Sequence, residues 1–302
     1  MRILFFYITL LLSLSLTAQQ QPVTISINAY SFNDLLSARS SRTNEQVYTY
    51  FNLLDWLASQ HIKALDATGY YFPTYPEVPS DEYLRRFKEK ARSVGVSISG
   101  TGIRNNFASP DPKIRAEGVE LAKKWLVAAR KMGAPVLRVF SGEIPKGYEN
   151  NWTEVAGWMI DCYKQLIPFA QKEGVRIGIQ NHGDMLQTAE QCAYVLNAVQ
   201  SEWVRLVLDI GSFRTEDPYQ DIAAMIPYAV NWQIKASPFA GGIPETDMNR
   251  LFAIIQKGGY KGFLPIETLP AKGKSYDPFE EILRMKKKVE EGMRHFYSIR
   301  TR

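Results

Sequence analysis

The feature of this chain that most constrains its fold is a repeated alternation of short β-rich runs with amphipathic helical stretches. Such alternation is typical of a parallel sheet covered by helices. The β-rich runs span residues 24–29, 64–67, 96–100, 136–140, 175–180, 204–208, 230–234 and 262–266. Because there are eight of them, the pattern favours a closed barrel over an open sheet. The sequence therefore predicts an α/β fold, a single (β/α)8 TIM barrel.

The predicted helices carry start and stop signals that fit this alternation. Asp111 can cap a helix with Pro112 in its first turn, and apolar residues recur at helical spacing from there to Gly133. Gly174 and Gly258-Gly259 stand at similar helix ends, before the fifth and the eighth β-rich run. Glycine suits these positions because it readily adopts the left-handed cap conformation.

The length and the first residues of the chain indicate its domain organisation. At 302 residues, the chain suits one α/β barrel, a fold that commonly reaches about 250 residues or more. Met1-Arg2, the apolar run 3–16 and the small exit Thr17-Ala18 are typical of a secretory signal peptide. The apolar run is short of the ~20 residues of a spanning helix, which disfavours a permanent anchor. We predict a signal peptide at residues 1–18, a barrel domain at residues 19–302 and an exported, periplasmic protein without a stable membrane anchor.

Charge and cysteine content bear on the partners of the protein. The formal net charge of +5 is spread over mixed helix faces, such as residues 286–288 (all Lys) followed by Glu290 and Glu291, so a nucleic-acid surface is not indicated. Cys162 and Cys192 lie within helical patterns and either pair or are simply buried. A barrel of this size does not need a disulfide, which favours burial. The sequence does not determine the oligomeric state, and a homo-oligomer is compatible with it.

Polar residues at the carboxyl ends of the β-rich runs are the candidates for a functional site, since these ends build the active site of TIM barrels. The residues expected to bind substrate are Asn28, Asp66, Arg104, Arg138 and Asn181. The aromatic and proline-rich segment 70–80 is expected to form the rim, either packed on its own aromatic rings or serving as a wall for sugar stacking.

The last four strand ends carry the groups that could do chemistry. The run Gln180-Asn181-His182 favours a polar pocket, because each polar group at a buried strand end must find a partner or cost about 1 to 3 kcal/mol. We assign His182 a catalytic role in preference to a structural one. Asp209 can hold a divalent cation or sugar hydroxyls, or alternatively cap the turn that follows it.

Gln233 and Lys235 share one face of their strand because side chains alternate with a period of two. If that face lines the barrel, Lys235 can neutralise an enediolate or, with a lowered pKa, act as a base. Glu267, at the end of the last strand, is the preferred general base. A structural ion pair between Lys235 and Glu267 is the alternative interpretation.

Four strand-end patterns together carry a family resemblance: Ile-x-Ile-x-Asn-His-Gly from Ile177, Leu-Asp-x-Gly from Leu208, x-x-Lys ending at Lys235 and Ile-Glu at Ile266. In this order and spacing they resemble the xylose-isomerase-like barrel family of sugar phosphate isomerases and epimerases, over nearly the whole mature chain. The resemblance implies a divalent metal, often manganese, held by Glu, Asp, His and Glu from strands five to eight. It also implies carboxylates that act as acid and base around an enediolate.

The chain departs from this family pattern at two of the four ligand positions. Gln180 stands in place of the first Glu and Gln233 in place of the His, while Asp209 and Glu267 match in type. The candidate metal ligands are therefore Gln180, Asp209, Gln233 and Glu267. Two amide oxygens bind a transition metal weakly, although a hard ion such as Mg²⁺ or Ca²⁺, or else Mn²⁺, remains a candidate cofactor. Two-base epimerisation loses a partner, since Gln180 cannot accept a proton at neutral pH.

Three functions follow from these residues. The favoured one is a carbohydrate-active isomerase or epimerase that enolises a small sugar, and export favours a non-phosphorylated sugar or keto-sugar as its substrate. A lyase that performs β-elimination on a keto-glycoside is the alternative, and a non-catalytic sugar-binding barrel is the third. The same barrel family also contains zinc endonucleases, which need many His ligands. Because this chain has three His in all, we set an endonuclease function aside.

Overall fold

The barrel is built from eight parallel strands that form one sheet. The computed structural model describes residues 23–37, 48–182, 185–237, 244–270, 273 and 275–297. The strands are β1 (Val23–Asn28), β2 (Ala64–Thr68), β3 (Ser97–Gly102), β4 (Val136–Phe140), β5 (Arg176–Gln180), β6 (Val204–Asp209), β7 (Ala229–Gln233) and β8 (Gly262–Ile266). Their order in the sheet is β7-β6-β5-β4-β3-β2-β1-β8.

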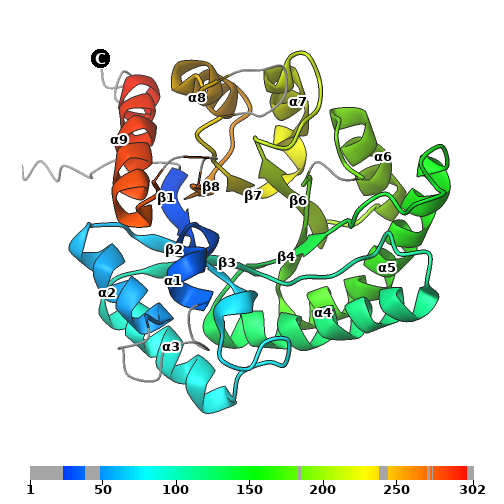
Figure 1. Ribbon diagram of the computed structural model, residues 1–302, viewed down its shortest axis with the longest axis horizontal. Coiled ribbons are helices and arrows are strands. Elements are labelled where there is room, and N and C mark those ends of the chain that lie inside the picture. Colours follow the sequence, from blue (N-terminus) through cyan, green and yellow to red (C-terminus); the bar gives the residue numbers. More distant parts are fainter. Residues whose placement is uncertain are drawn as a thin grey trace, which may run out of the picture.

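The ring closes between the ends of β7 and β8. The Ile234 amide donates to the Pro265 carbonyl at 2.7 Å, and the Glu267 amide donates to the Ile234 carbonyl at 2.9 Å. Figure 1 shows the strands in the centre and the helices around them. The predicted single (β/α)8 barrel is confirmed, and each predicted strand overlaps the observed one with shifts of at most two residues.

One long helix follows each strand and covers the outside of the ring (Figure 1). These helices are α2 (Tyr50–Ser59), α3 (Asp81–Ser93), α4 (Pro112–Met132), α5 (Trp152–Glu173), α6 (Ala189–Val199), α7 (Pro218–Met225), α8 (Met248–Lys257) and α9 (Pro278–Tyr297). The short α1 (Asn33–Ser37) follows a 3-10 turn, Ala29–Phe32, directly after β1. It therefore lies at the rim where the strands end.

The predicted helix ends are present. The Asp111 side chain accepts a hydrogen bond from the Lys113 amide at 2.8 Å and so caps α4, which ends before Gly133 with φ of 87°. Cys162 and Cys192 are both buried and free, so the preference for burial over pairing is confirmed. The predicted signal peptide, residues 1–18, lies outside the described residues. No described helix combines the length and apolar character that a membrane crossing requires.

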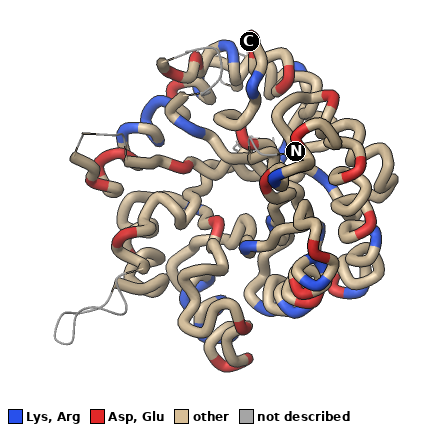
Figure 2. The backbone as a smooth tube through the Cα atoms, turned by 45° about the vertical axis from the view of Figure 1, so that its right-hand side comes forward, with Lys and Arg blue, Asp and Glu red and all other residues tan. Residues whose placement is uncertain are grey.

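Charged residues of both signs are interspersed over the outer helices, as Figure 2 shows. On α3, for example, Arg85 pairs with Glu89, and on α9 Lys286 pairs with Glu290. An exposed pair such as Arg85–Glu89 contributes little stability. This mixing of charges agrees with the mixed helix faces expected from the sequence.

The interior of the barrel is packed in layers, because alternate residues of each strand point inward. A Cβ atom placed on Gly178 would lie 2.5 Å from a methyl group of Val207 and 2.9 Å from one of Val136. These three residues, from three adjacent strands, are thus in contact inside the barrel. Two residues further along the same strands stand Arg138, Gln180 and Asp209. The small residue at position 178 therefore lets neighbouring valines fill the space beneath the polar layer.

Substitution of Gly178 by Ala is expected to destabilise the protein by about 1 to 3 kcal/mol through overpacking against Val207. Urea unfolding followed by circular dichroism measures the effect. The added change Val207→Ala should recover part of the loss, since the two residues are in contact. Gly157→Ala is the matched control, because nothing lies within 4 Å of a Cβ atom at that helical position. Equal free energies of unfolding for Gly178→Ala and wild type would contradict the layer packing.

Candidate functional site

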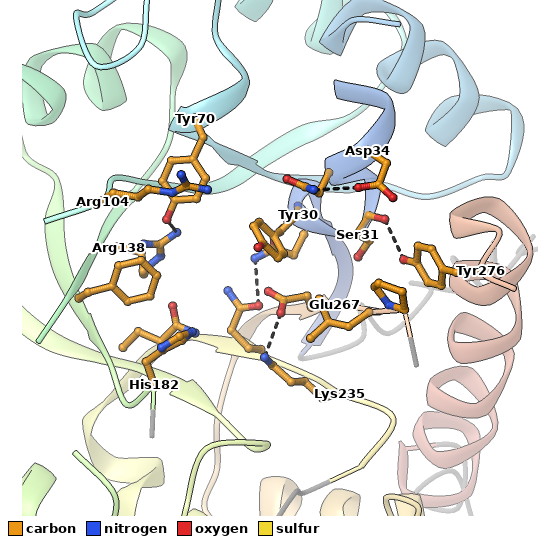
Figure 3. A pocket seen from close by; sticks show the side chains of 17 residues that line it. Tyr30, Ser31, Asp34, Tyr70, Arg104, Arg138, His182, Lys235, Glu267 and Tyr276 are labelled. Carbon is orange, nitrogen blue, oxygen red and sulfur yellow. Dashed lines mark hydrogen bonds and ion pairs between the residues drawn. The ribbon is translucent and has the colours of Figure 1, made fainter. Parts of the chain in front are cut away.

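A cavity of about 570 Å³ opens at the carboxyl ends of the strands. Its lining comes from residues at or shortly after the ends of seven of the strands, all except β6, together with Tyr276 before α9. It comprises Asn28, Tyr30, Ser31, Asn33, Asp34, Tyr70, Arg104, Arg138, Phe140, Gln180, His182, Gln233, Lys235, Glu267, Leu269, Pro270 and Tyr276. Figure 3 shows these side chains converging from separate strands. The position agrees with the rule that TIM barrels carry their sites at this rim.

The floor of the cavity is held by an ammonium group between two carboxylates. Lys235 Nζ lies 2.9 Å from Glu267 Oε1 and 3.2 Å from Asp209 Oδ2. The three side chains come from β6 and from the residues that follow β7 and β8, and each exposes 9% or less of its side chain. The ion pair expected as an alternative for Lys235 and Glu267 is therefore present, with Asp209 as a third member.

These neighbours determine the charge of Lys235. Burial alone would lower the pKa of Lys235, but the nearby carboxylates of Asp209 and Glu267 outweigh burial and raise this pKa above its ordinary value. The side chain is therefore a cation at neutral pH. Of the two roles expected for Lys235, this environment favours neutralising an enediolate over acting as a base.

Both carboxylate oxygens of Asp209 are engaged by protein donors. Gln180 Nε2 donates to Oδ2 at 2.8 Å, and the Gly211 amide donates to Oδ1 at 2.9 Å. Asn181 binds the backbone of the same residue: its Nδ2 donates to the Asp209 carbonyl, and its Oδ1 accepts from the Asp209 amide. Gln180, Asn181 and the Gly211 amide thus hold Asp209 in place. The bond from Gly211 also agrees with the alternative prediction that Asp209 caps the turn that follows it.

Asn28 and Gln233 form a second polar pair in the floor. Asn28 Nδ2 donates to Gln233 Oε1 at 2.9 Å. Asn28 Oδ1 accepts from the Tyr30 amide at 2.8 Å and so caps the 3-10 turn after β1. The amide oxygen of Gln233 is therefore directed at another side chain of the floor.

Two arginines and a tyrosine form one wall of the cavity (Figure 3). Arg138 Nη1 donates to the Ile103 carbonyl at 2.7 Å, and its Nη2 donates to the Tyr70 hydroxyl at 2.5 Å. The guanidinium of Arg104 lies 4.3 Å from the centre of the Tyr70 ring. Burial raises the pKa of the Tyr70 hydroxyl despite the two guanidinium groups nearby. The hydroxyl therefore stays protonated, and the wall offers mainly hydrogen-bond donors to a bound molecule.

His182 lies on the neighbouring wall, with its ring edge-on to Phe140 at 4.7 Å between ring centres. Gln180 and His182 both line the cavity, whereas Asn181 between them does not. The two-residue period of a strand accounts for this arrangement, because it places positions 180 and 182 on the same face.

The predicted site residues fall into two groups. Those that line the cavity are Asn28, Arg104, Arg138, Gln180, His182, Gln233, Lys235 and Glu267. Asp209 lies directly beneath, in contact with Lys235 and Gln180. Asp66 and Asn181 are buried and do not line the cavity, so their predicted substrate contacts have no support in the geometry.

Several lining residues were not anticipated from the sequence. Tyr30, Ser31 and Asp34 follow β1, and a systematic reading of the residues after each strand end would have included the first two. Tyr276 reaches the cavity from the segment before α9, where its hydroxyl donates to the Ser31 carbonyl at 2.8 Å. The sequence carries no signal for that contact, since 245 positions separate the two residues.

Segment 70–80 combines both interpretations given to it. Phe72 is buried against Phe87, and the Trp125 indole donates to the Pro76 carbonyl at 2.9 Å, so most of the segment packs on aromatic rings. Among the residues of this segment, Tyr70 lines the cavity. The segment is therefore a packed rim that presents one aromatic ring to the site.

Asp66 lies one layer below the floor. Its Oδ2 accepts from Asn231 Nδ2 at 3.0 Å, and Asn231 also reaches the Ser99 carbonyl at 3.4 Å. Burial raises the pKa of Asp66 to about 6, the Glu267 carboxylate adds to this shift, and Arg138 opposes it. A carboxyl group that resists ionisation thus supports the floor from beneath.

Comparison with known proteins places this geometry in a family. Residues 60–299 match the family described as Xylose isomerase-like TIM barrel. The chain is 23% identical over 255 residues to L-ribulose-5-phosphate 3-epimerase UlaE of Shigella boydii, covering 76% of this chain and 87% of the relative.

Two solved structures share the fold. The 3-keto-D-glucoside 4-epimerase YcjR of E. coli superposes with a TM-score of 0.69 at 10% identity, over 89% of this chain and 99% of that one. The IOLI protein with a bound zinc atom superposes with a TM-score of 0.71 at 15% identity, over 91% of this chain and 99% of that one.

The residues of the floor do not fit a divalent metal. The four predicted ligands, Gln180, Asp209, Gln233 and Glu267, do lie together. However, an ammonium group contacts both carboxylates, and amide donors occupy Asp209 and Gln233. Across the described ranges, no group of three or more His, Cys, Asp or Glu side chains is placed to hold a metal ion. The family resemblance predicts that these four residues bind a metal ion. The contacts that their oxygen atoms make in the structure do not support this prediction.

The raised pKa of Asp66 gives a prediction for stability. Between about pH 4 and pH 6 the folded protein keeps a proton that the unfolded chain has lost, so the stability contributed by this group falls as the pH rises through that window. For a pKa raised to about 6, the loss is roughly 2 to 3 kcal/mol. Asp66→Asn cannot ionise and still accepts from Asn231. Its free energy of unfolding relative to wild type should therefore increase by this amount from about pH 4 to pH 7.

Urea unfolding at several pH values measures this difference. Asp161→Asn, at an exposed position of α5, is the control and should show a much smaller change with pH. A difference between Asp66→Asn and wild type that stays constant from acid to neutral pH would show that Asp66 ionises as easily in the folded as in the unfolded chain.

Proposed function

Because the chain belongs to the Xylose isomerase-like TIM barrel family, we propose that it is a carbohydrate-active enzyme of the isomerase or epimerase type. It enolises a non-phosphorylated sugar or keto-sugar, with Glu267 as the base. The observation that carries the proposal is the contact of 2.9 Å between Lys235 Nζ and Glu267 Oε1 at the floor of the cavity. A base and a cation side by side are what proton removal next to a carbonyl requires.

The reaction begins when Glu267 removes a proton from the carbon next to the sugar carbonyl. The electrons of the broken C–H bond form a C=C bond, and the carbonyl oxygen takes up the displaced electron pair and becomes anionic. The ammonium group of Lys235 donates a hydrogen bond to this oxygen and lowers the energy of the enediolate. Return of the proton to the former carbonyl carbon yields an isomer, while the hydroxyl proton of the adjacent carbon moves to the former carbonyl oxygen. Return of the proton to the opposite face of the original carbon yields an epimer.

Glu267 is suited to the role of base by its position. Its Oε1 pairs with Lys235, and the residue lines the cavity in which a substrate would lie. Gln180 and Gln233, which flank the same floor, cannot accept a proton at neutral pH. A second acid or base, where the reaction needs one, is His182 on the neighbouring wall.

The remaining walls suit a polar molecule of sugar size. A volume of about 570 Å³ lies within the range of about 300–1,000 Å³ common for small-molecule sites. Arg104 and Arg138 offer donors to hydroxyl or carbonyl oxygens, and the rings of Tyr30 and Tyr70 border the same space. The Arg138 guanidinium is already oriented by Tyr70 and Ile103, which reduces the cost of ordering it on binding.

The substrate class rests on two further supports. The predicted signal peptide implies that the protein acts outside the cytoplasm, in the periplasm, where phosphorylated sugars are scarce. The name of the YcjR structure describes a keto-glucoside, a sugar without phosphate. UlaE is named for a phosphorylated pentulose, so phosphorylated sugars belong in the test as the competing class.

A lyase that eliminates a leaving group from a keto-glycoside is the second candidate. It shares the first step, after which the enediolate expels the group on the next carbon. The neutral amide at position 180 favours this candidate, because elimination needs one carboxylate base where two-base epimerisation needs a pair. His182 would protonate the leaving group.

The test is incubation of the mature protein with free, keto- and phosphorylated sugars in D2O, followed by NMR. We expect deuterium to enter next to the carbonyl of a non-phosphorylated sugar, and Glu267→Gln to slow this exchange by about 10²- to 10⁴-fold. Glu291→Gln, an exposed carboxylate of α9, is the control and should exchange like wild type.

The products distinguish the candidates. Sugar isomers support the isomerase or epimerase, and an unsaturated sugar supports the lyase. Deuterium exchange by Glu267→Gln at the wild-type rate would show that Glu267 is not the base. Tight binding of a sugar without any exchange would indicate a non-catalytic sugar-binding protein.

A further inference from the structure

The cavity floor contains a cation that belongs to the protein itself. Lys235 Nζ contacts one oxygen of Asp209 and one of Glu267, the two residues that match the metal ligands of the family pattern in type. We propose that the ammonium group of Lys235 replaces the divalent metal ion in this site. Asp209 and Glu267 then hold this ammonium, and the site functions without a bound metal.

The position of Lys235 supports the replacement. It follows β7 by two residues and shares its face with Gln233, so the side chain enters the floor next to the position of the missing His. Its side chain is 8% exposed, and its Nζ lies 2.9 and 3.2 Å from the two carboxylates. These are hydrogen-bonding distances of an ammonium group, and they leave no room for an ion between the amine and the carboxylates.

The remaining ligand atoms are also occupied by protein donors. Asp209 accepts from Gln180 and from the Gly211 amide, in addition to Lys235. Gln233 Oε1 accepts from Asn28. A metal ion would have to displace these donors as well as the lysine, which would leave buried polar groups without partners.

The catalytic part of this inference rests on the proposed function. A metal in such a site would stabilise the oxyanion as a Lewis acid. Lys235 does so by donating hydrogen bonds, for which an ammonium has three N–H groups. The contacts with Asp209 and Glu267 hold this ammonium group at the floor of the cavity.

A titration with Mn²⁺, followed by electron paramagnetic resonance, tests the replacement without any substrate. The proteins are wild type, the double variant Gln180→Glu/Gln233→His, which restores the family ligands, and the triple variant with Lys235→Ala added. Wild type and the double variant should bind Mn²⁺ no tighter than about 1 mM. The triple variant should bind at least about tenfold tighter than the double variant.

Two results overturn the inference: micromolar binding of Mn²⁺ at the floor while Lys235 is in place, or a triple variant that binds no tighter than the double variant. Lys261→Ala, added to the double variant, is the matched control, because it removes an exposed lysine at the other end of the barrel. It should leave the affinity unchanged. If Lys235→Ala fails to fold, Lys235→Gln in the same background keeps a hydrogen-bond donor for the carboxylates and takes its place.

A second arm uses the sugar that the exchange assay identifies. Wild-type turnover should be unaffected by EDTA and by added Mn²⁺, and Lys235→Ala should lose turnover by at least about 10²-fold. Loss of wild-type turnover in EDTA with recovery in Mn²⁺ overturns the inference. If no sugar is converted, the proposed function is wrong. The Mn²⁺ titration then still shows whether the ammonium group of Lys235 prevents a metal ion from binding at the floor.

Discussion

The buried ammonium of Lys235 between Asp209 and Glu267 is the interaction on which the site depends. Taking a single charge out of water costs several kcal/mol, and only close pairing with further hydrogen bonds offsets that cost. The floor meets both conditions, since Lys235 contacts both carboxylates and Asp209 also accepts from Gln180 and the Gly211 amide. The three side chains come from consecutive strands, so the cluster also fixes β6, β7 and β8 relative to one another. Such a cluster contributes specificity of arrangement more than net stability.

The polar character continues below the floor, which is unusual for the interior of a barrel that large apolar side chains normally fill. Ser26 and Ser99 share a hydrogen bond of 2.7 Å, and Asn231 binds Asp66. Because the pKa of Asp66 is raised to about 6, part of this layer is neutral near that pH, which limits the negative charge beneath Glu267. The arginines of the opposite wall supply positive charge, so the cavity has a cationic wall and a nearly balanced floor.

Much of this arrangement could be predicted from residue order alone. The two-residue period of strands and the meeting of parallel strand ends at one rim sufficed to bring positions 180, 209, 235 and 267 together. The same period could have separated Asn181 from its two neighbours. The charge of Lys235 could not be predicted from the sequence. It depends on the distances of about 3 Å from Lys235 to Asp209 and Glu267, which are known only once the barrel has closed. The contribution of Tyr276 to the cavity could not be predicted either. This residue lies in an irregular segment, where no regular spacing indicates which way a side chain points.

A cation that is part of the chain differs from a metal ion in what it can stabilise. It is always present and oriented by its two carboxylates, but it carries one charge and withdraws fewer electrons from a carbonyl than a divalent ion does. The proposed enolisation therefore suits a substrate whose proton is already activated. A ketone within the sugar ring meets that condition, since its carbonyl exists without ring opening, whereas an aldose must first open its ring. The proposed replacement of metal by lysine thus favours keto-sugars over simple aldoses as the substrates of this barrel.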